Sequence, residues 1–416
     1  MKRQLLFVSS LLALFFIACD SNEDDSEYAE YLVARPIVMS RADFTSSVDI
    51  LPPKPIDESG KVYAYENYIF INDKSRGIHV INNNNPQQPV KVAFIEIPGN
   101  VDISVKDNYL YADSIMDLIV LDISDIQNIE QVNRLENVLR EGIIFPFGAD
   151  IVEYGAYDYE TEILVGWETV TERRLIEEVQ NTDDIFFGDI AVAESSDNGT
   201  TGEGGSLARF KIVGEYLYAV DSHNINVFDI SDLENPQDLE DVYAGFDIET
   251  IFNRGEHLFL GSMRGMYIYD ISSPATPTFV SEFQHGTACD PVVVDGDYAY
   301  VTLRGGNGCG ALESGLFIVD ISNIQQPELT ISYPMDEPYG LGIRNEKLFI
   351  FDGSSGLKVY DKTNVEDISL LNHFEDIVTF DVIPLENQLI MVGDEILYQY
   401  EYLDDNIRLI SQIGLN

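Results

Sequence analysis

The chain has 416 residues, and its 72 acidic side chains against 24 basic ones give a formal net charge of −48. This balance excludes a nucleic-acid binder that works through a broad basic surface, because phosphate recognition depends on lysine and arginine. Hydrophobic residues make up 45% of the chain, with 23 Tyr and 22 Phe, which excludes a solvated acidic polymer. The length fits one large β-domain or two to three smaller domains.

The first 18 residues have the form of a secretory signal peptide. Lys2 and Arg3 precede an apolar run over residues 5–17, which is too short to span a bilayer as a stable helix. The acidic residues 19–31 then predict a solvated tether, and residues 32–60 predict an N-terminal extension that packs on the folded domain. No later run is long and apolar enough to span a membrane.

The end of the signal resembles a bacterial lipobox. Phe16, Ile17 and Ala18 stand before Cys19, and the resemblance implies cleavage before Cys19 and acyl chains on its sulfur and amine. The alternative is an ordinary signal peptide with an incidental cysteine. The acidic tether is similar to the stretch that directs lipoproteins to the surface of Bacteroidetes-type bacteria. This similarity implies a surface-exposed protein of the outer membrane, held by its acyl chains alone.

One pattern recurs along the chain about every 41 residues. It is an apolar strand of the form Gly-φ-x-φ-φ-Asp-Ile-Ser, where φ is apolar or aromatic. The spacing is interrupted by an insertion over residues 141–205 and by a shorter one over residues 305–314. The copies occupy residues 77–82, 117–124, 224–231, 265–272, 315–322, 356–361 and, in a decayed form, 395–400.

Each repeat unit contains four strand signals with turn residues between them. In the fifth unit Asp295-Gly296 marks a tight turn between the first two strands. Seven such units predict an all-β fold, a seven-bladed β-propeller of four-stranded antiparallel blades over residues 61–416. Six or eight blades are the alternatives, because part of the insertion could complete a sheet. A parallel β-helix is disfavoured, since its coils are much shorter.

The strings Leu-Phe-Ile-Val-Asp (316–320) and Leu-Ile-Val-Leu-Asp (118–122) resemble the LVIVD repeat of bacterial secreted and lipid-anchored proteins with a propeller-like fold. The first and last copies depart from the pattern, with Asn82 and Tyr400 where the Asp is expected. The resemblance implies an architecture but no activity. We expect the recurring Asp to be structural, accepting hydrogen bonds from backbone N–H groups of the following turn.

Propeller topology places the blade-to-blade loops and the loops between second and third strands on one face, here called the top face. Both insertions fall there. Because Cys289 and Cys309 lie in two top-face loops of blade 5, we predict a disulfide between them, although His285 permits a Cys/His nucleophile instead. The aromatic part of the long insertion, which contains Trp167, is expected to lie over the ring as a β-hairpin or as extended strands, and residues 195–206 are expected to be disordered.

Several charged residues are also predicted on the top face. They could be paired ions around a solvent-filled channel. Alternatively they form a polar mouth with a cationic focus for an anionic or hydroxyl-rich ligand. The candidate ligand-binding residues are Lys74, Arg76, Arg209, His223, Arg264, Asp290 and Arg304.

Motifs for serine hydrolases, zinc proteases, phosphate loops and EF-hands are absent from the sequence. We therefore expect no catalytic residues and no cofactor, while the clustered aspartates leave calcium open. The predicted function is a lipid-anchored envelope module that binds a glycan, an anionic small molecule or a protein. The alternative is a hydrolase or lyase acting on carbohydrates or anions in the top-face mouth. A redox quinoprotein has only fold analogy in its favour.

Overall fold

The computed structural model describes most of the chain from residue 28 onward. The described residues are 28–139, 146, 149–153, 155, 157–158, 160–175, 201, 203–204, 207–284, 291–304, 314–393, 395–404 and 406–416. The predicted signal peptide, Cys19, Cys289, Asp290 and Cys309 lie outside these ranges, as does most of the predicted disordered segment.

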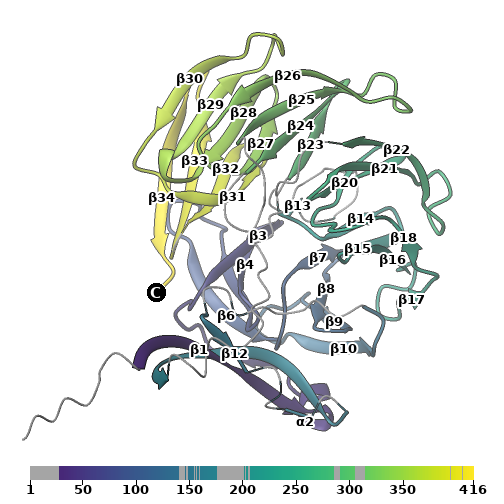
Figure 1. The fold of residues 1–416 in the computed structure, drawn as a ribbon, viewed down its shortest axis with the longest axis vertical. Coiled ribbons are helices and arrows are strands. Elements are labelled where there is room, and N and C mark those ends of the chain that lie inside the picture. The colour runs from purple at the N-terminus through teal and green to yellow at the C-terminus, as the bar shows by residue number, and fades with distance from the viewer. Residues whose placement is uncertain are drawn as a thin grey trace, which may run out of the picture.

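Seven sheets, each built on four antiparallel strands that follow one another in the chain, make up most of the described structure (Figure 1). We number them blades 1 to 7 in chain order. Blade 1 contains β3 (Ser59–Tyr65), β4 (Tyr68–Asp73), β5 (Gly77–Asn82) and β6 (Val90–Glu96). Blade 2 contains β7 (Ile103–Lys106), β8 (Tyr109–Ser114), β9 (Asp117–Asp122) and β10 (Glu130–Leu135). Blade 3 contains β14 (Phe210–Val213), β15 (Tyr216–Val220) and β16 (Asn224–Asp229), and its fourth position is split between β17 (Gln237–Asp238) and β18 (Val242–Tyr243).

The remaining blades are regular. Blade 4 contains β19 (Phe252–Arg254), β20 (His257–Ser262), β21 (Gly265–Asp270) and β22 (Thr278–Gln284). Blade 5 contains β23 (Val292–Asp295), β24 (Tyr298–Leu303), β25 (Gly315–Asp320) and β26 (Glu328–Pro334). Blade 6 contains β27 (Pro338–Arg344), β28 (Lys347–Asp352), the short helix η2 (Gly353–Ser355), β29 (Leu357–Asp361) and β30 (Ser369–Phe374). Blade 7 contains β31 (Thr379–Pro384), β32 (Gln388–Gly393), β33 (Ile396–Tyr402) and β34 (Ile407–Gly414). The prediction of an all-β propeller is confirmed, and the blade number of the whole chain stays a prediction.

Apolar side chains between neighbouring blades hold the ring together. The junction of the first and last blades is closed in the same way, with Ile69 and Ile71 of blade 1 packed against Ile390 and Val392 of blade 7. The buried side-chain amides of Asn83 and Gln399 exchange hydrogen bonds of 2.9 and 2.8 Å across this junction. A single blade exposes both faces of its sheet, so ring packing supplies the burial that each repeat lacks.

In blades 2 to 6, an Asp at the end of the third strand stabilises the turn that follows it. Oδ1 of Asp122 accepts a hydrogen bond from the backbone N–H of Ser124 at 2.8 Å, and Asp320 accepts one from Ser322 at the same distance. Hydrogen bonds from the turn lower the pKa of Asp229, Asp270, Asp320 and Asp361. In the first copy the Asn82 amide oxygen accepts from the N–H of Asn84 at 3.0 Å. The expected structural role of this position is confirmed.

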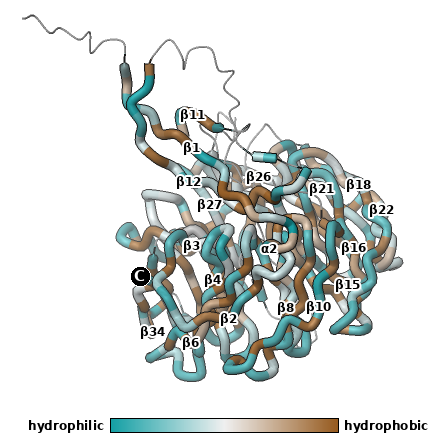
Figure 2. Tube along the Cα trace, turned by 90° about the horizontal axis from the view of Figure 1, so that it is seen from below, coloured by the Kyte–Doolittle hydropathy of each residue, from teal (hydrophilic) through white to brown (hydrophobic). Residues whose placement is uncertain are grey.

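The N-terminal extension and the long insertion form one structure outside the blades. The strand β1 (Tyr28–Ser40) pairs along its whole length with the antiparallel β12 (Glu162–Leu175) and also with the short parallel β11 (Ile151–Val152). This ribbon projects from the body of the ring (Figure 2). Because β1 begins at Tyr28, residues 28–31 are strand, although the sequence analysis placed them in the tether.

The base of the ribbon is docked on the top face of blade 2. The helix α2 (Arg41–Thr45) buries Phe44 among Ile115 of the β8–β9 turn and Ile163 and Val165 of β12. The guanidinium of Arg134 lies 4.5 Å from the centre of the Phe44 ring. The insertion is thus anchored through these residues. After α2, the strand β2 (Asp49–Leu51) adds to the outer edge of blade 1 through β6.

Trp167 lies elsewhere on the ribbon. It is partly buried in β12, opposite Pro36 of β1.

Candidate binding surface on the top face

The central channel contains part of the insertion. Thr201 forms a bridge with Lys106 at the end of β7, and the short strand β13 (Glu203–Gly204) pairs antiparallel with Ala64 and Tyr63 of β3 (Figure 1). At the start of β7, Asp102 accepts hydrogen bonds from the backbone N–H groups that open β14. The described residues Thr201, Glu203 and Gly204 therefore lie along the innermost strands of blades 1 and 2.

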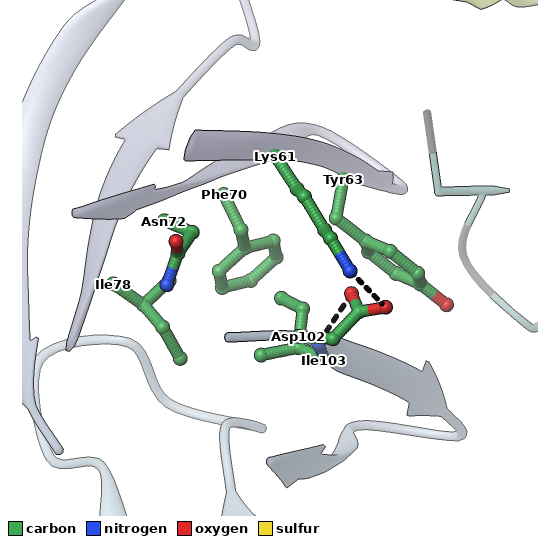
Figure 3. Close-up of a pocket in the computed structure, with 7 residues that line it drawn as sticks. All are labelled: Lys61, Tyr63, Phe70, Asn72, Ile78, Asp102 and Ile103. Carbon is green, nitrogen blue, oxygen red and sulfur yellow. Dashed lines mark hydrogen bonds and ion pairs between the residues drawn. The ribbon is translucent and has the colours of Figure 1, made fainter. Parts of the chain in front are cut away.

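A buried ion pair lies beside this segment (Figure 3). Nζ of Lys61 is 3.1 Å from Oδ2 of Asp102, and the two side chains are 14% and 4% exposed. Asp102 also accepts from the N–H of Phe210 at 3.1 Å and from that of Ile103 at 2.8 Å. Burial lowers the pKa of Lys61, and the nearby Arg209 lowers it further, while Asp102 opposes the shift. The cavity between these side chains has room for about one water molecule.

A buried Asp connects blade 7 to blade 1 in the same way, by accepting a backbone hydrogen bond from the following blade. Oδ2 of the buried Asp381 accepts a hydrogen bond from the backbone N–H of Val62 at 3.1 Å, and Oδ1 accepts one from Val382 at 2.9 Å. Asp102 and Asp381 thus bind the innermost strand of the following blade. The contacts of both carboxylates are structural, because each one holds the backbone of a neighbouring blade.

Lys74 and Arg76 lie in the β4–β5 turn of blade 1, where they hold the N-terminal extension. Nζ of Lys74 is 2.8 Å from Oε1 of Glu58, and Arg76 is ion-paired with Asp57. The buried Asp73 accepts the backbone N–H groups of Asp57 at 3.2 Å and Glu58 at 3.1 Å. Each of these two cations therefore has a carboxylate partner from the chain itself.

Arg304 connects two later blades. It follows β24 of blade 5, and its guanidinium carbon lies 4.0 Å from the centre of the Tyr339 ring in blade 6. Arg304 is partly buried and directly precedes the short insertion over residues 305–314.

His223 and Arg264, two of the predicted ligand-binding residues, meet at an aromatic side chain from the loop between blades 3 and 4. The ring of Phe246 is 5.6 Å from that of His223 at an angle of 78°, and the guanidinium carbon of Arg264 is 5.2 Å from its centre. Tyr243 stands edge-on to Phe246, with the ring centres 6.0 Å apart. Nε of Arg264 is 3.0 Å from Oδ2 of Asp247. We call Tyr243, Phe246, His223, Arg264 and Asp247 the aromatic cluster.

The two aromatic rings of the cluster face solvent. Tyr243 is 58% exposed and Phe246 is 48% exposed, and both His223 and Arg264 are exposed as well. Tyr243 and Phe246 were not among the predicted ligand-binding residues, because both lie outside the repeated strand pattern. The dipeptide Gly245-Phe246, a glycine beside an aromatic residue in a connecting segment, could have pointed to them.

Backbone hydrogen bonds hold this loop on both sides. The N–H of Ala244 donates to the carbonyl of His223 at 2.8 Å, and the N–H of Met263 donates to that of Asp247 at 3.1 Å. Gly245 has a φ of +144°, and a Cβ at this position would come within 2.9 Å of the Tyr267 ring. The exposed rings are thus presented by a loop that is fixed between two blades.

The repeat pattern matches a known family model. The LVIVD repeat model matches residues 99–132, 204–242, 254–284 and 285–334. The chain contains LVIVD repeats. The matches cover the second to fifth copies of the pattern, and the structure shows that the first, sixth and seventh copies form strands at the same place in their blades. No curated protein sequence matches the chain.

Solved structures share the fold at low sequence identity. A protein from Lactobacillus plantarum is 12% identical, with a TM-score of 0.52, and the match covers 79% of this chain and 87% of that one. The computationally designed Ika8 protein is 10% identical, with a TM-score of 0.50, over 87% of this chain and 89% of its own. These similarities support the fold alone.

Two further features of the described residues bear on function. None of the helices there has the length and apolar character needed to cross a membrane. Within the same ranges, no group of three or more His, Cys, Asp or Glu side chains is placed to hold a metal ion.

Proposed function

We propose that this protein is a binding module whose ligand, a glycan, an anionic small molecule or a protein, contacts the aromatic cluster on the top face. The observation that carries the proposal is the exposure of Tyr243, at the end of β18, and of Phe246, on the fixed loop that follows it. Exposed aromatic side chains lose apolar contact with solvent when a ligand covers them, and they are frequent at the centres of binding sites.

The fixed loop strengthens this proposal. A loop that is already ordered before binding loses little conformational entropy in the complex, so more of the contact energy appears as affinity. His223, Arg264 and Asp247 add polar groups around the rings, which supply orientation and specificity. The central channel is a weaker candidate, because Thr201 and β13 lie against its innermost strands.

Site-specific crosslinking in the cells that make the protein tests the proposal without knowledge of the ligand. Phe246→p-benzoylphenylalanine should give a covalent adduct on illumination, and the adduct should be lost when Tyr243→Ala is added. Phe279 is a matched control, since it is an exposed phenylalanine of blade 4, 55% accessible. Equal adduct yields from positions 246 and 279 would refute the proposal.

We further propose that the propeller is anchored to the outer membrane by acyl chains on Cys19 and faces the outside of the cell. Metabolic labelling with an alkynyl fatty acid should mark the wild-type protein but not Cys19→Ser. Protease treatment of intact cells should remove the propeller, and a protected protein would contradict surface exposure. The Cys289–Cys309 disulfide belongs to the same proposal, and free thiols at both positions in non-reducing mass spectrometry would exclude it.

A further inference from the structure

Acidic residues lie close in sequence to the residues of the aromatic cluster. Asp221 accepts the backbone N–H groups of His223 at 2.7 Å and Asn224 at 2.8 Å, so it lies in the turn that carries His223. The exposed Glu240 lies between β17 and β18, two residues before the start of the strand that ends at Tyr243. In a chain with a net charge of −48, this region adds local negative charge to a general negative field.

Blade 4 contributes a further carboxylate. Glu282 of β22 lies opposite Tyr267 of β21, the residue whose ring contacts the loop at Gly245. The hydroxyl of Tyr269 lies 3.4 Å from the carbonyl oxygen of Tyr243. Blade 4 therefore carries a carboxylate on the strand next to the one that contacts the loop.

Arg264 shows how a cation is held at this place. Its guanidinium lies over the Phe246 ring while its Nε contacts the Asp247 carboxylate. A guanidinium can stack on an aromatic face and bind a carboxylate at the same time, which a lysine ammonium does less well. The more exposed ring of Tyr243 offers a second aromatic face to a cation of a ligand.

We infer that the aromatic cluster binds an arginine-containing segment of a partner protein. This inference rests on the proposed function and narrows its ligand class. Complementary charge favours a basic segment over an anionic glycan, because like charges repel and the cluster's own arginine is already paired with Asp247. The aromatic rings add cation–π contacts, which the general negative charge of the chain does not supply.

Fluorescence anisotropy with a labelled octa-arginine peptide at physiological ionic strength tests the inference. Tyr243→Ala should raise the Kd about 5-fold, since a cation–π contact at an exposed site is worth up to about 1 kcal/mol. The control Phe279→Ala should change it less than about 2-fold. A labelled octa-lysine peptide should bind more weakly than octa-arginine, and octa-glutamate should not bind.

The acidic residues need their own control, because a chain of this charge attracts any polycation. The double change Glu240→Gln/Glu282→Gln should weaken octa-arginine binding more than Glu366→Gln/Asp367→Asn, a pair of exposed changes on blade 6 that removes the same number of charges. Equal effects at the two places, or equal effects of Tyr243→Ala and Phe279→Ala, would show that only net charge acts and would overturn the inference. If crosslinking from position 246 persists in that case, the proposed function stands and only its ligand class fails.

Discussion

The central channel and the aromatic cluster differ in the solvent exposure of their side chains. In the channel, Lys61 and Asp102 are buried, and the carboxylate is shared among the ammonium and backbone donors of two blades. In the cluster, Tyr243 and Phe246 stay exposed although their loop is fixed. A polar side chain whose hydrogen-bond partners all come from the chain itself stabilises the fold. An ordered side chain that is exposed to solvent can instead contact a ligand.

The strongest test of this comparison is the buried carboxylate. Asp102→Ala should lower the free energy of unfolding by about 3–5 kcal/mol, because it leaves the Lys61 ammonium buried without its partner. Glu58→Ala breaks the exposed pair with Lys74 and should cost less than about 1 kcal/mol. Urea unfolding measures both, and equal losses would show that the channel pair is not a structural element.

The second test uses pH. Asp113 of blade 2 accepts the N–H groups of Val101 at 2.8 Å and Asp102 at 2.9 Å, yet burial raises its pKa to about 6. The folded state then holds a proton that the unfolded state releases above its ordinary pKa, so stability falls as pH rises from about 4 to about 6. The loss should be on the order of 3 kcal/mol. Asp113→Asn should remove this slope, and an unchanged pH profile of unfolding would contradict the assignment.

A smaller effect is expected at the recurring Asp. Asp320→Ala removes the acceptor of the Ser322 N–H and should cost about 1 kcal/mol. Asp320→Asn should cost clearly less, because Asn82 makes the same contact in the first copy. Thermal unfolding of the two variants separates a hydrogen-bonding role from a charge role, and equal losses would favour charge.

The smallest effect on stability is expected in the aromatic cluster. Phe246→Ala should change the free energy of unfolding by no more than about 0.5 kcal/mol, since the ring is exposed and lies outside the blade cores. A loss comparable to that of Asp102→Ala in the same urea experiment would mean that the ring is a packing element, and the comparison between the two regions would fail.

Local patterns in the sequence were sufficient for the repeated part of the fold. The period, the alternation of apolar residues and the turn dipeptides predicted four-stranded blades, and the role of Asp320 followed from its place before a turn. The same topology placed His223 and Arg264 on the top face, since loops of one kind lie on one side of a propeller. It did not say that these two residues meet at Phe246, because that contact depends on the course of a loop outside the repeat.

The sequence by itself determined the all-β repeat architecture, because strand period and turn chemistry act between residues that are close along the chain. Only the tertiary structure decided the partners of the unrepeated segments. Three kinds of contact join residues that are distant in sequence or carry no periodic signal. They are the pairing of β1 with β12, the pairing of Thr201 and β13 with the innermost strands, and the ion pairs of Lys74 and Arg76. Such contacts form because they bury apolar surface and compensate charges in the folded ring. Both effects arise only when the blades have assembled.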